Sequence, residues 1–269
     1  MTKTAKYLLF TFITSWIIQV IGSNDYNSGG MAGAVSLSYS MSLCMLMPTF
    51  GVLFAGADIR KFGWKPNIEK NIKLLLSAWL MPTVFQITGA AFYYIIFPDD
   101  FDASGEFFKS TNPSVLAELE KSGNSYGIYV IKEIFYSLTS FYTFLAIFSG
   151  LGEEIGWRGF LYPELKKSFG ETKGAPLPGL FAFCIFTVTT GIISDYLFEK
   201  SKSIWFPAIF HGLVNSTVNP NMLRGGEHFE RTIFGPVSIG LISVVPTALF
   251  AAGILCLKNR RESTEYTDF

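Results

Sequence analysis

The stretch FYTFLAIFSGLGEEIGWRG, residues 141–159, is the end of an apolar run that starts near residue 128 and closes in a cluster of charged groups. A charged side chain at helix-centre depth in a bilayer costs about 2.5 to 3.5 kcal/mol on insertion scales. Charges at such a position therefore need a partner or a function. Glu153, Glu154 and Arg158 are the first candidate functional residues.

The composition of the whole chain is that of a membrane protein. Of the 269 residues, 49% are hydrophobic and only 16% are charged, and the mean hydropathy is +0.35, well above soluble averages. The 21 basic and 21 acidic residues cancel, which gives no indication of a nucleic-acid partner. The three cysteines lie in apolar runs and have no metal-type or disulfide spacing. These features predict a polytopic membrane protein in contact with the lipid bilayer.

A bilayer needs about 20 apolar residues per transmembrane helix. The sequence contains stretches of this kind at residues 7–22, 33–56, 72–97, 128–151, 177–198, 204–218 and 234–257. We interpret the first as a retained helix and not as a signal peptide, because no convincing small-residue cleavage site follows it. The predicted fold class is all-α, a polytopic transmembrane helical bundle of about seven spans, forming a single integral membrane domain over residues 1–269.

The distribution of basic residues tests this topology, because short cytoplasmic loops are enriched in Lys and Arg. The first four spans obey the rule. With seven spans, however, Lys200, Lys202 and the basic C-terminal tail fall on the outside. One extra span between Lys173 and Leu177 would restore the expected excess on the inside. Alternatively, residues 204–218 dip into the membrane and return without crossing it. The charges thus behave as though one helix were missing.

The charged cluster has two interpretations. If the helix continues past Leu151, Glu154 and Arg158 are four residues apart on one face and can form an ion pair, whereas Glu153 points about 100° away. One carboxylate would then be held and the other left available. The alternative is an ordinary helix end at the membrane interface, where charged side chains reach water at little cost.

Two further polar residues lie inside a later apolar run. His211 and Asn215 are four residues apart, so they share a helix face, which suits two groups converging on a carbonyl oxygen or a water. The alternative is a histidine bonded to a neighbouring helix for packing. The other histidine, His228, lies in a polar loop and is interpreted as a solvated surface residue.

The order of these two motifs resembles that of a known family. The segments EEIGWRGFLYPEL, residues 153–165, and KSIWFPAIFHGLVN, residues 202–215, are similar to those of the CAAX-protease and bacteriocin-processing family of intramembrane proteases, whose members are also described as self-immunity proteins. The resemblance covers about residues 128–218. The rest of the chain is similar only as apolar helices.

The resemblance implies a function and roles for the five residues. Glu153 would be the base that activates water, Glu154 and Arg158 its supporting pair, and His211 with Asn215 would bind a metal or the oxyanion. The water would be bound to zinc or free of metal; the residues leave this open. The implied partners are a peptide or protein substrate at the membrane, either prenylated or of the bacteriocin type. The implied location is the bacterial cytoplasmic membrane.

The chain departs from the family pattern in one respect. The family has a further helix between the two motifs with a Phe-x-x-x-His element, and this chain has no such histidine: its only histidines are His211 and His228. The absent helix is the one that the loop charges require. We therefore expect a family member that lacks one transmembrane segment and has impaired activity. One alternative is a non-catalytic immunity or peptide-binding protein. A transporter is a weaker alternative, because the sequence shows no inverted repeat of the kind that many transporters have.

Overall fold

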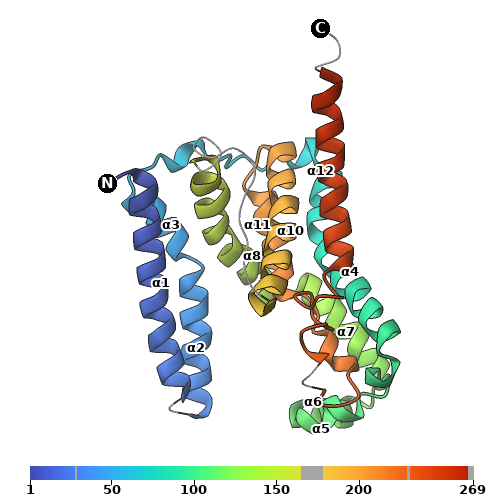
Figure 1. The fold of residues 1–269 in the computed structure, drawn as a ribbon. Helices are drawn as coiled ribbons and strands as arrows, with labels where there is room; N and C mark the ends of the chain where they lie inside the picture. Colours follow the sequence, from blue (N-terminus) through green and yellow to red (C-terminus); the bar gives the residue numbers. More distant parts are fainter. Residues whose placement is uncertain (28, 165–177, 229–230, 266–269) are drawn as a thin grey trace. The chain divides into compact units, whose positions relative to one another are not determined.

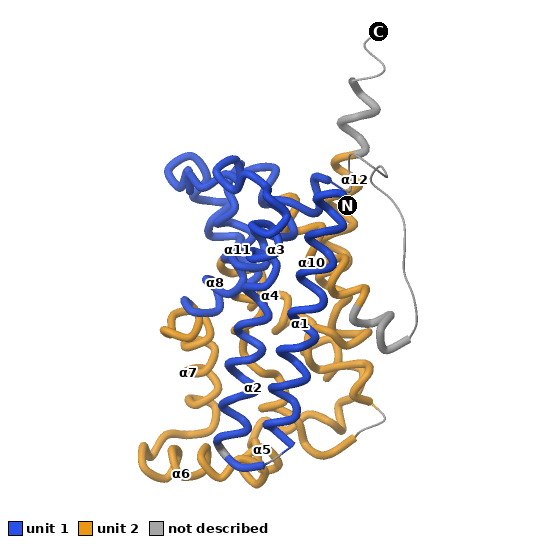
Figure 2. The backbone as a smooth tube through the Cα atoms, turned by 90° about the vertical axis from the view of Figure 1, so that its left-hand side faces the viewer, with its two compact units in different colours: residues 1–78, 144–173, 197–212 blue, residues 79–143, 174–196, 213–269 orange. Residues whose placement is uncertain are grey.

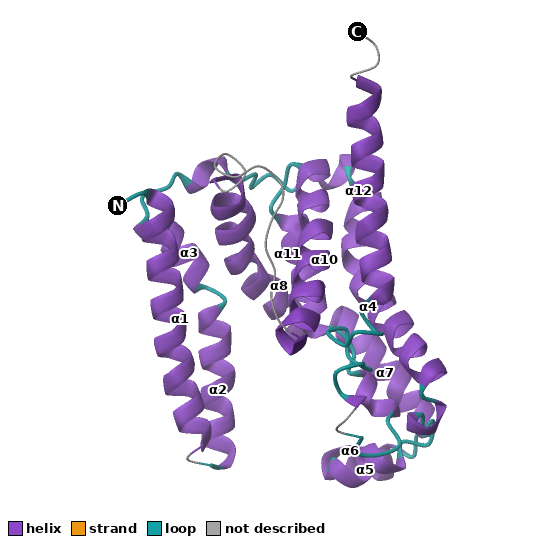
Figure 3. Cartoon of the chain, viewed as in Figure 1, coloured by secondary structure: helices purple, strands orange, loops and turns teal. Residues whose placement is uncertain are grey.

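The fold is helical throughout the part of the chain that the computed structural model describes, residues 1–27, 29–164, 178–228 and 231–265. These residues contain no β-strand, and their only bridge of strand type joins Phe101 to Arg224. Figure 3 shows helices connected by loops. The predicted all-α class is confirmed.

The helices labelled in Figure 1 follow one another along the chain. The longer ones are α1 (Lys3–Asn27), α2 (Gly30–Cys44), α3 (Met47–Phe54), α4 (Ile72–Ile96), α6 (Pro113–Ser122), α7 (Tyr126–Thr139), α8 (Phe141–Glu154), α10 (Pro178–Ser201), α11 (Trp205–Ser216) and α12 (Val245–Glu265). The short ones are α5 (Glu106–Thr111), the π-helix η4 (Ile155–Leu161) and four 3-10 turns, at Ile59–Lys61, Ile68–Lys70, Pro98–Asp100 and Pro220–Leu223.

Several of these helices can cross a membrane, so the chain is an integral membrane protein. Among the described residues, three segments are long and apolar enough: α1, residues 32–54 and α4. A fourth is added if α7 and α8 with its continuation count as one broken span. The break lies at Ser140, whose backbone is extended between the two helices. Fewer helices thus meet the length and composition criteria than the seven predicted.

The predicted span 33–56 corresponds to the observed apolar segment 32–54, which is divided into two helices because α2 ends at Cys44 and α3 begins at Met47. The prediction of a span from residue 234 was wrong: residues 234–244 form turns, and α12 starts at Val245. In this segment Pro236 has no backbone N–H to donate to a helix, and Leu241 N–H instead bonds back to Ile233 O at 2.9 Å. The predicted extra span lies between residues 173 and 177, outside the described residues.

The chain divides into two compact units, each assembled from three stretches of sequence. Unit 1 contains residues 1–78, 144–173 and 197–212, and unit 2 contains residues 79–143, 174–196 and 213–269. Figure 2 shows them in different colours. The single membrane domain expected from the sequence stays a prediction.

Unit 1 has its own apolar core. Helix α1 packs along α2 and α3, and α3 packs on η4. Tyr7, Val52, Leu151, Phe160 and Ile204 are buried at the centre of this cluster. They come from four helices and from the residue that precedes α11, so the core connects α8 and its continuation to the N-terminal helices and to the start of α11. The charged motif is therefore anchored on a packed framework.

Unit 2 is held by contacts between the loop after α4 and the segment after α11. Asp102 N–H donates to Leu223 O, and Gly225 N–H donates to Asp100 O, each at 2.8 Å. Tyr94 on α4 adds a side-chain hydrogen bond to Pro220 O at 2.8 Å. These bonds satisfy backbone groups of two loops that are far apart in sequence.

Candidate functional site

The acidic motif lies where α8 changes into the π-helix η4. Helical structure continues past Leu151 through Glu154, and the wider π-helical turn begins at Ile155. Such turns are rare and are found frequently at functional sites. Because the backbone stays helical, motif residues that are four positions apart in the sequence lie on the same helix face, as expected from the sequence.

Glu154 and Arg158 form an ion pair. Nη1 of Arg158 lies 2.7 Å from Oε1 of Glu154. The Glu154 side chain is fully buried and that of Arg158 is 15% exposed, so solvent screens this pair little. The ion pair predicted from the four-residue spacing is confirmed, and the alternative of an ordinary solvated helix end does not fit a buried carboxylate.

His211 binds the same carboxylate oxygen from another helix. Its Nδ1 lies 2.9 Å from Oε1 of Glu154. Because an ionised carboxylate only accepts, the proton of this hydrogen bond belongs to Nδ1. Neutral His211 then has a lone pair on Nε2, suited to a metal or to a water proton, whereas the imidazolium has a second N–H that can donate to an oxyanion. Glu154 stabilises the second form by its charge.

Two glycines let α8 and α11 come close enough for this contact. A Cβ on Gly212 would collide with the backbone of Ile147, and a Cβ on Gly150 would lie 3.1 Å from Ala208 O. Glycine at these two crossing points removes the side chains that would separate the helices. The approach of the backbones brings His211 to Glu154.

Glu153 has a different partner. Its Oε2 accepts a hydrogen bond from Nε1 of Trp157 at 3.0 Å, and Trp157 is its only hydrogen-bond partner among the described residues. Glu154 is thus compensated by a guanidinium and an imidazole, whereas Glu153 is held by a neutral donor. The expected division between a paired and an available carboxylate is present. Trp157 was missed by sequence reasoning, although it lies four residues after Glu153 and hence on the same face.

Asn215 lies one turn after His211 on α11 and is exposed. It belongs to unit 2, whereas Glu153, Glu154, Arg158 and His211 all belong to unit 1. The contacts join three of the five predicted residues, Glu154, Arg158 and His211, and Glu153 is next to Glu154 in the sequence of the same unit. The functional role of each remains a prediction.

Residues 135–217 match the family model Rce1-like, described as type II CAAX prenyl endopeptidase Rce1-like. The chain carries an Rce1-like segment. The match contains both the Glu153 and the His211 motifs, and it confirms the resemblance predicted from them. CAAX prenyl endopeptidases cleave peptide bonds, so protease activity is the property of the matched family. No curated protein and no solved structure matches the chain.

A metal site was tested on the residues of this Rce1-like segment and its surroundings. A catalytic zinc site normally has three protein ligands and an open position for water. The described residues contain no group of three His, Cys, Asp or Glu side chains that could hold one ion. Glu154 and His211 are moreover bound to each other. The donor set of the described residues does not fit such a zinc site.

The second histidine lies outside the Rce1-like segment, in unit 2. Nε2 of His228 is 2.9 Å from Oδ1 of Asp100, a side chain with no exposed surface. The hydroxyl of Tyr93 donates to the same carboxylate. The interpretation of His228 as a solvated surface residue was wrong, because its imidazole contacts the buried carboxylate of Asp100. His228 is a structural histidine of unit 2.

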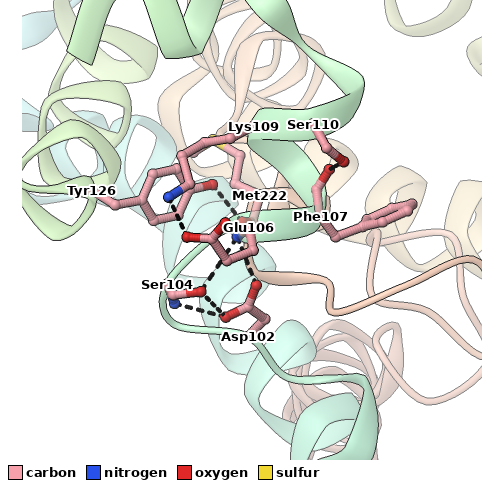
Figure 4. A network of polar contacts seen from close by, with 8 residues as sticks. All are labelled: Asp102, Ser104, Glu106, Phe107, Lys109, Ser110, Tyr126 and Met222. Carbon is pink, nitrogen blue, oxygen red and sulfur yellow. Dashed lines mark hydrogen bonds and ion pairs between the residues drawn. The ribbon is translucent and has the colours of Figure 1, made fainter. Parts of the chain in front are cut away.

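Two aspartates of the same loop, the exposed Asp99 and the half-buried Asp102, are stabilised in their charged form. Arg231 Nη1 donates to Asp99 at 2.7 Å, which holds the pKa of Asp99 below its usual value. Asp102 accepts from the Ser104 hydroxyl at 2.6 Å and from the Ser104 and Glu106 N–H groups at 2.8 Å each, as Figure 4 shows. These bonds, the hydroxyl first, lower the pKa of Asp102. This loop is organised by local polar contacts.

Proposed function

We propose that the chain is an endopeptidase that cleaves a peptide bond at the membrane with a water activated by Glu153. The observation that carries the proposal is the unequal partnering of the two glutamates. Arg158 and His211 both bind Glu154, while among the described residues Glu153 accepts only the neutral Trp157 N–H. A carboxylate that is not engaged in an ion pair can contact a water and take its proton, as a general base does.

The reaction needs no group beyond the chain and a water. Glu153 takes one proton from the water, and the oxygen forms a bond to the carbonyl carbon of the scissile peptide. The C–N bond then breaks, and Glu153 returns its proton to the leaving amine. The imidazolium form of His211, stabilised by Glu154, would donate from Nε2 to the developing oxyanion. For Asn215 the same role rests only on the family resemblance.

Turnover is proposed to be slow. Loss of one oxyanion donor in other proteases costs about 100- to 1000-fold in rate, and this chain lacks the Phe-x-x-x-His histidine of the family that it resembles. The remaining histidine, His228, is engaged by Asp100. The proposed substrate is a prenylated or bacteriocin-type peptide in the bacterial cytoplasmic membrane.

Zinc, the cofactor that the family resemblance leaves open, has its own test. Purified protein would be analysed for bound metal and assayed with and without a chelator. Stoichiometric zinc together with loss of turnover on chelation would contradict the metal-free assignment of water activation to Glu153.

A non-catalytic peptide-binding or immunity protein is the second candidate. The observation in its favour is that the buried charge of Glu154 is compensated within the protein by Arg158 and His211. Such a group can be retained as a structural element of a binding site. A cellular immunity phenotype that survives both Glu153→Ala and His211→Ala would favour this function over catalysis.

The proposal is tested with a fluorogenic farnesylated CAAX peptide and protein reconstituted in liposomes. We expect slow cleavage that falls at least about 100-fold in Glu153→Gln, since general acid–base groups contribute typically 100- to 10,000-fold. Glu118→Gln, an exposed position on α6, is the matched control and should retain the rate. Cleavage unaffected by Glu153→Gln would refute the role of Glu153, and fast cleavage by the unmodified protein would refute impairment.

A further inference from the structure

Helix α1 contains no residue of either motif, yet it contacts the side chain that holds Glu153. The Tyr7 ring meets the Trp157 indole edge-on, with centroids 6.3 Å apart and planes at 82°. Trp157 Nε1 in turn donates to Glu153 Oε2 at 3.0 Å. Tyr7, Trp157 and Glu153 therefore form a continuous chain of contacts inside unit 1.

Tyr7 is itself tightly fixed. Its side chain has no exposed surface, and its ring packs at 5.1 Å between centroids on Phe160. A Cβ added at Gly156 would lie 2.6 Å from the Tyr7 hydroxyl, so the tyrosine lies directly against the turn that carries Trp157. A ring enclosed in this way has one position, and it limits the rotamers open to the half-buried indole beside it.

A glutamate used as a base has to be held within about 0.5 Å of its working geometry. Glu153 has no ion pair to do this among the described residues, and its long side chain has several rotamers in the absence of a partner. The single hydrogen bond from Trp157 is effective only if the indole is itself immobile. The contact from α1 supplies that immobility.

We propose that Tyr7 and Trp157 are positioning residues for Glu153, the indole by its hydrogen bond and the Tyr7 ring by fixing the indole. The expected effect of these residues on turnover rests on the proposed function. The arrangement of the three side chains can be tested independently of that function. It makes α1 part of the site, although the segment that matches the family begins at residue 135.

The experiment uses full-length protein labelled with 5-fluorotryptophan and observed by fluorine NMR. The chain has five tryptophans, and the Trp157 resonance is identified by its loss in Trp157→Phe. We expect Glu153→Ala to shift this resonance, because the indole N–H loses its acceptor, and Tyr7→Leu to shift or broaden it, because the ring that immobilises the indole is gone. Tyr7→Phe, which keeps the ring, should restore a sharp resonance near the original position.

Phe10→Leu is the matched control, because Phe10 also makes a ring contact from α1, with Phe54 at 4.9 Å, but does not contact Trp157. Its Trp157 resonance should be unchanged. The Trp79 resonance, from an indole bonded to Leu138 O in unit 2, reports whether each variant is folded; Tyr7→Met replaces Tyr7→Leu if that variant fails this check. The proposal would be overturned if the chemical shift and linewidth of the Trp157 resonance were unchanged in Glu153→Ala or after loss of the Tyr7 ring.

Turnover provides the second readout. Trp157→Phe is expected to lower kcat about 10- to 100-fold, the range for losing one hydrogen bond to a charged group. Tyr7→Leu combined with Trp157→Phe should be no slower than Trp157→Phe alone. If the unmodified protein has no turnover, the proposed function fails while the NMR result still decides the positioning role.

Discussion

Replacing Arg158 by methionine should destabilise the protein strongly. The Glu154 side chain is fully buried, and its Oε1 receives both Arg158 at 2.7 Å and His211 at 2.9 Å. Arg158→Met keeps much of the apolar stem and removes the guanidinium. Glu154 would then be left with the imidazole as its remaining partner, in a position from which water is excluded.

The magnitude follows from this burial. Removing one partner of a buried ion pair typically costs about 3 to 5 kcal/mol, because the other charge stays buried and uncompensated. Since His211 remains in contact, we expect the lower end, about 3 kcal/mol. At about 2 to 4 °C per kcal/mol for a chain of this size, Tm should fall by about 6 to 12 °C.

The assay is thermal unfolding of purified protein in one detergent, with each variant measured under the same conditions. The double variant Glu154→Gln, Arg158→Met removes the buried charge as well and should be more stable than Arg158→Met alone. Arg60→Met is the matched control, because its partner Asp58 and the guanidinium are both well exposed, and such pairs contribute little.

Two results would refute this reasoning. One is an Arg158→Met variant whose Tm is no lower than that of Arg60→Met, which would mean that the carboxylate is not a buried charge dependent on its partner. The other is a double variant less stable than Arg158→Met, which would assign the loss to packing and not to electrostatics.

Two further predictions concern the helix contact and the acidic loop. Gly212→Ala should destabilise the protein by about 1 to 3 kcal/mol in thermal unfolding, because its Cβ would meet the Ile147 backbone. Gly150→Ala should cost less, because its Cβ would lie 3.1 Å from its nearest neighbour. Equal losses would show that the close approach of the two helices at Gly212 does not determine the stability. The pKa of Asp102 is lowered in the folded state, so its contribution to stability is complete above the unfolded value near 3.9 and disappears as the pH falls through the folded value. Hydrogen exchange of residues 98–106 should therefore accelerate below about pH 4, and Asp102→Asn should remove that dependence; acceleration that persists in the variant would assign it to another group.

The sequence was sufficient wherever the determining interaction is local. Apolar runs predict transmembrane helices because apolar side chains are stable in contact with lipid. Helices α1 and α4 occur close to their predicted bounds. The Glu154–Arg158 ion pair follows from the four-residue period of a helix and needs no knowledge of the rest of the fold. The same argument separates Glu153 from Glu154.

Only the tertiary structure decided which helices meet. His211 reaches Glu154 because Gly150 and Gly212 let two helices touch, and no periodicity contains that information. Tyr7 contacts Trp157 although the two residues are far apart in the sequence of unit 1. The failure at residues 234–244 and the pairing of His228 with Asp100 have the same cause: hydropathy measures the preference of a segment for lipid or water, whereas turns and buried charge pairs depend on which distant groups fold against it.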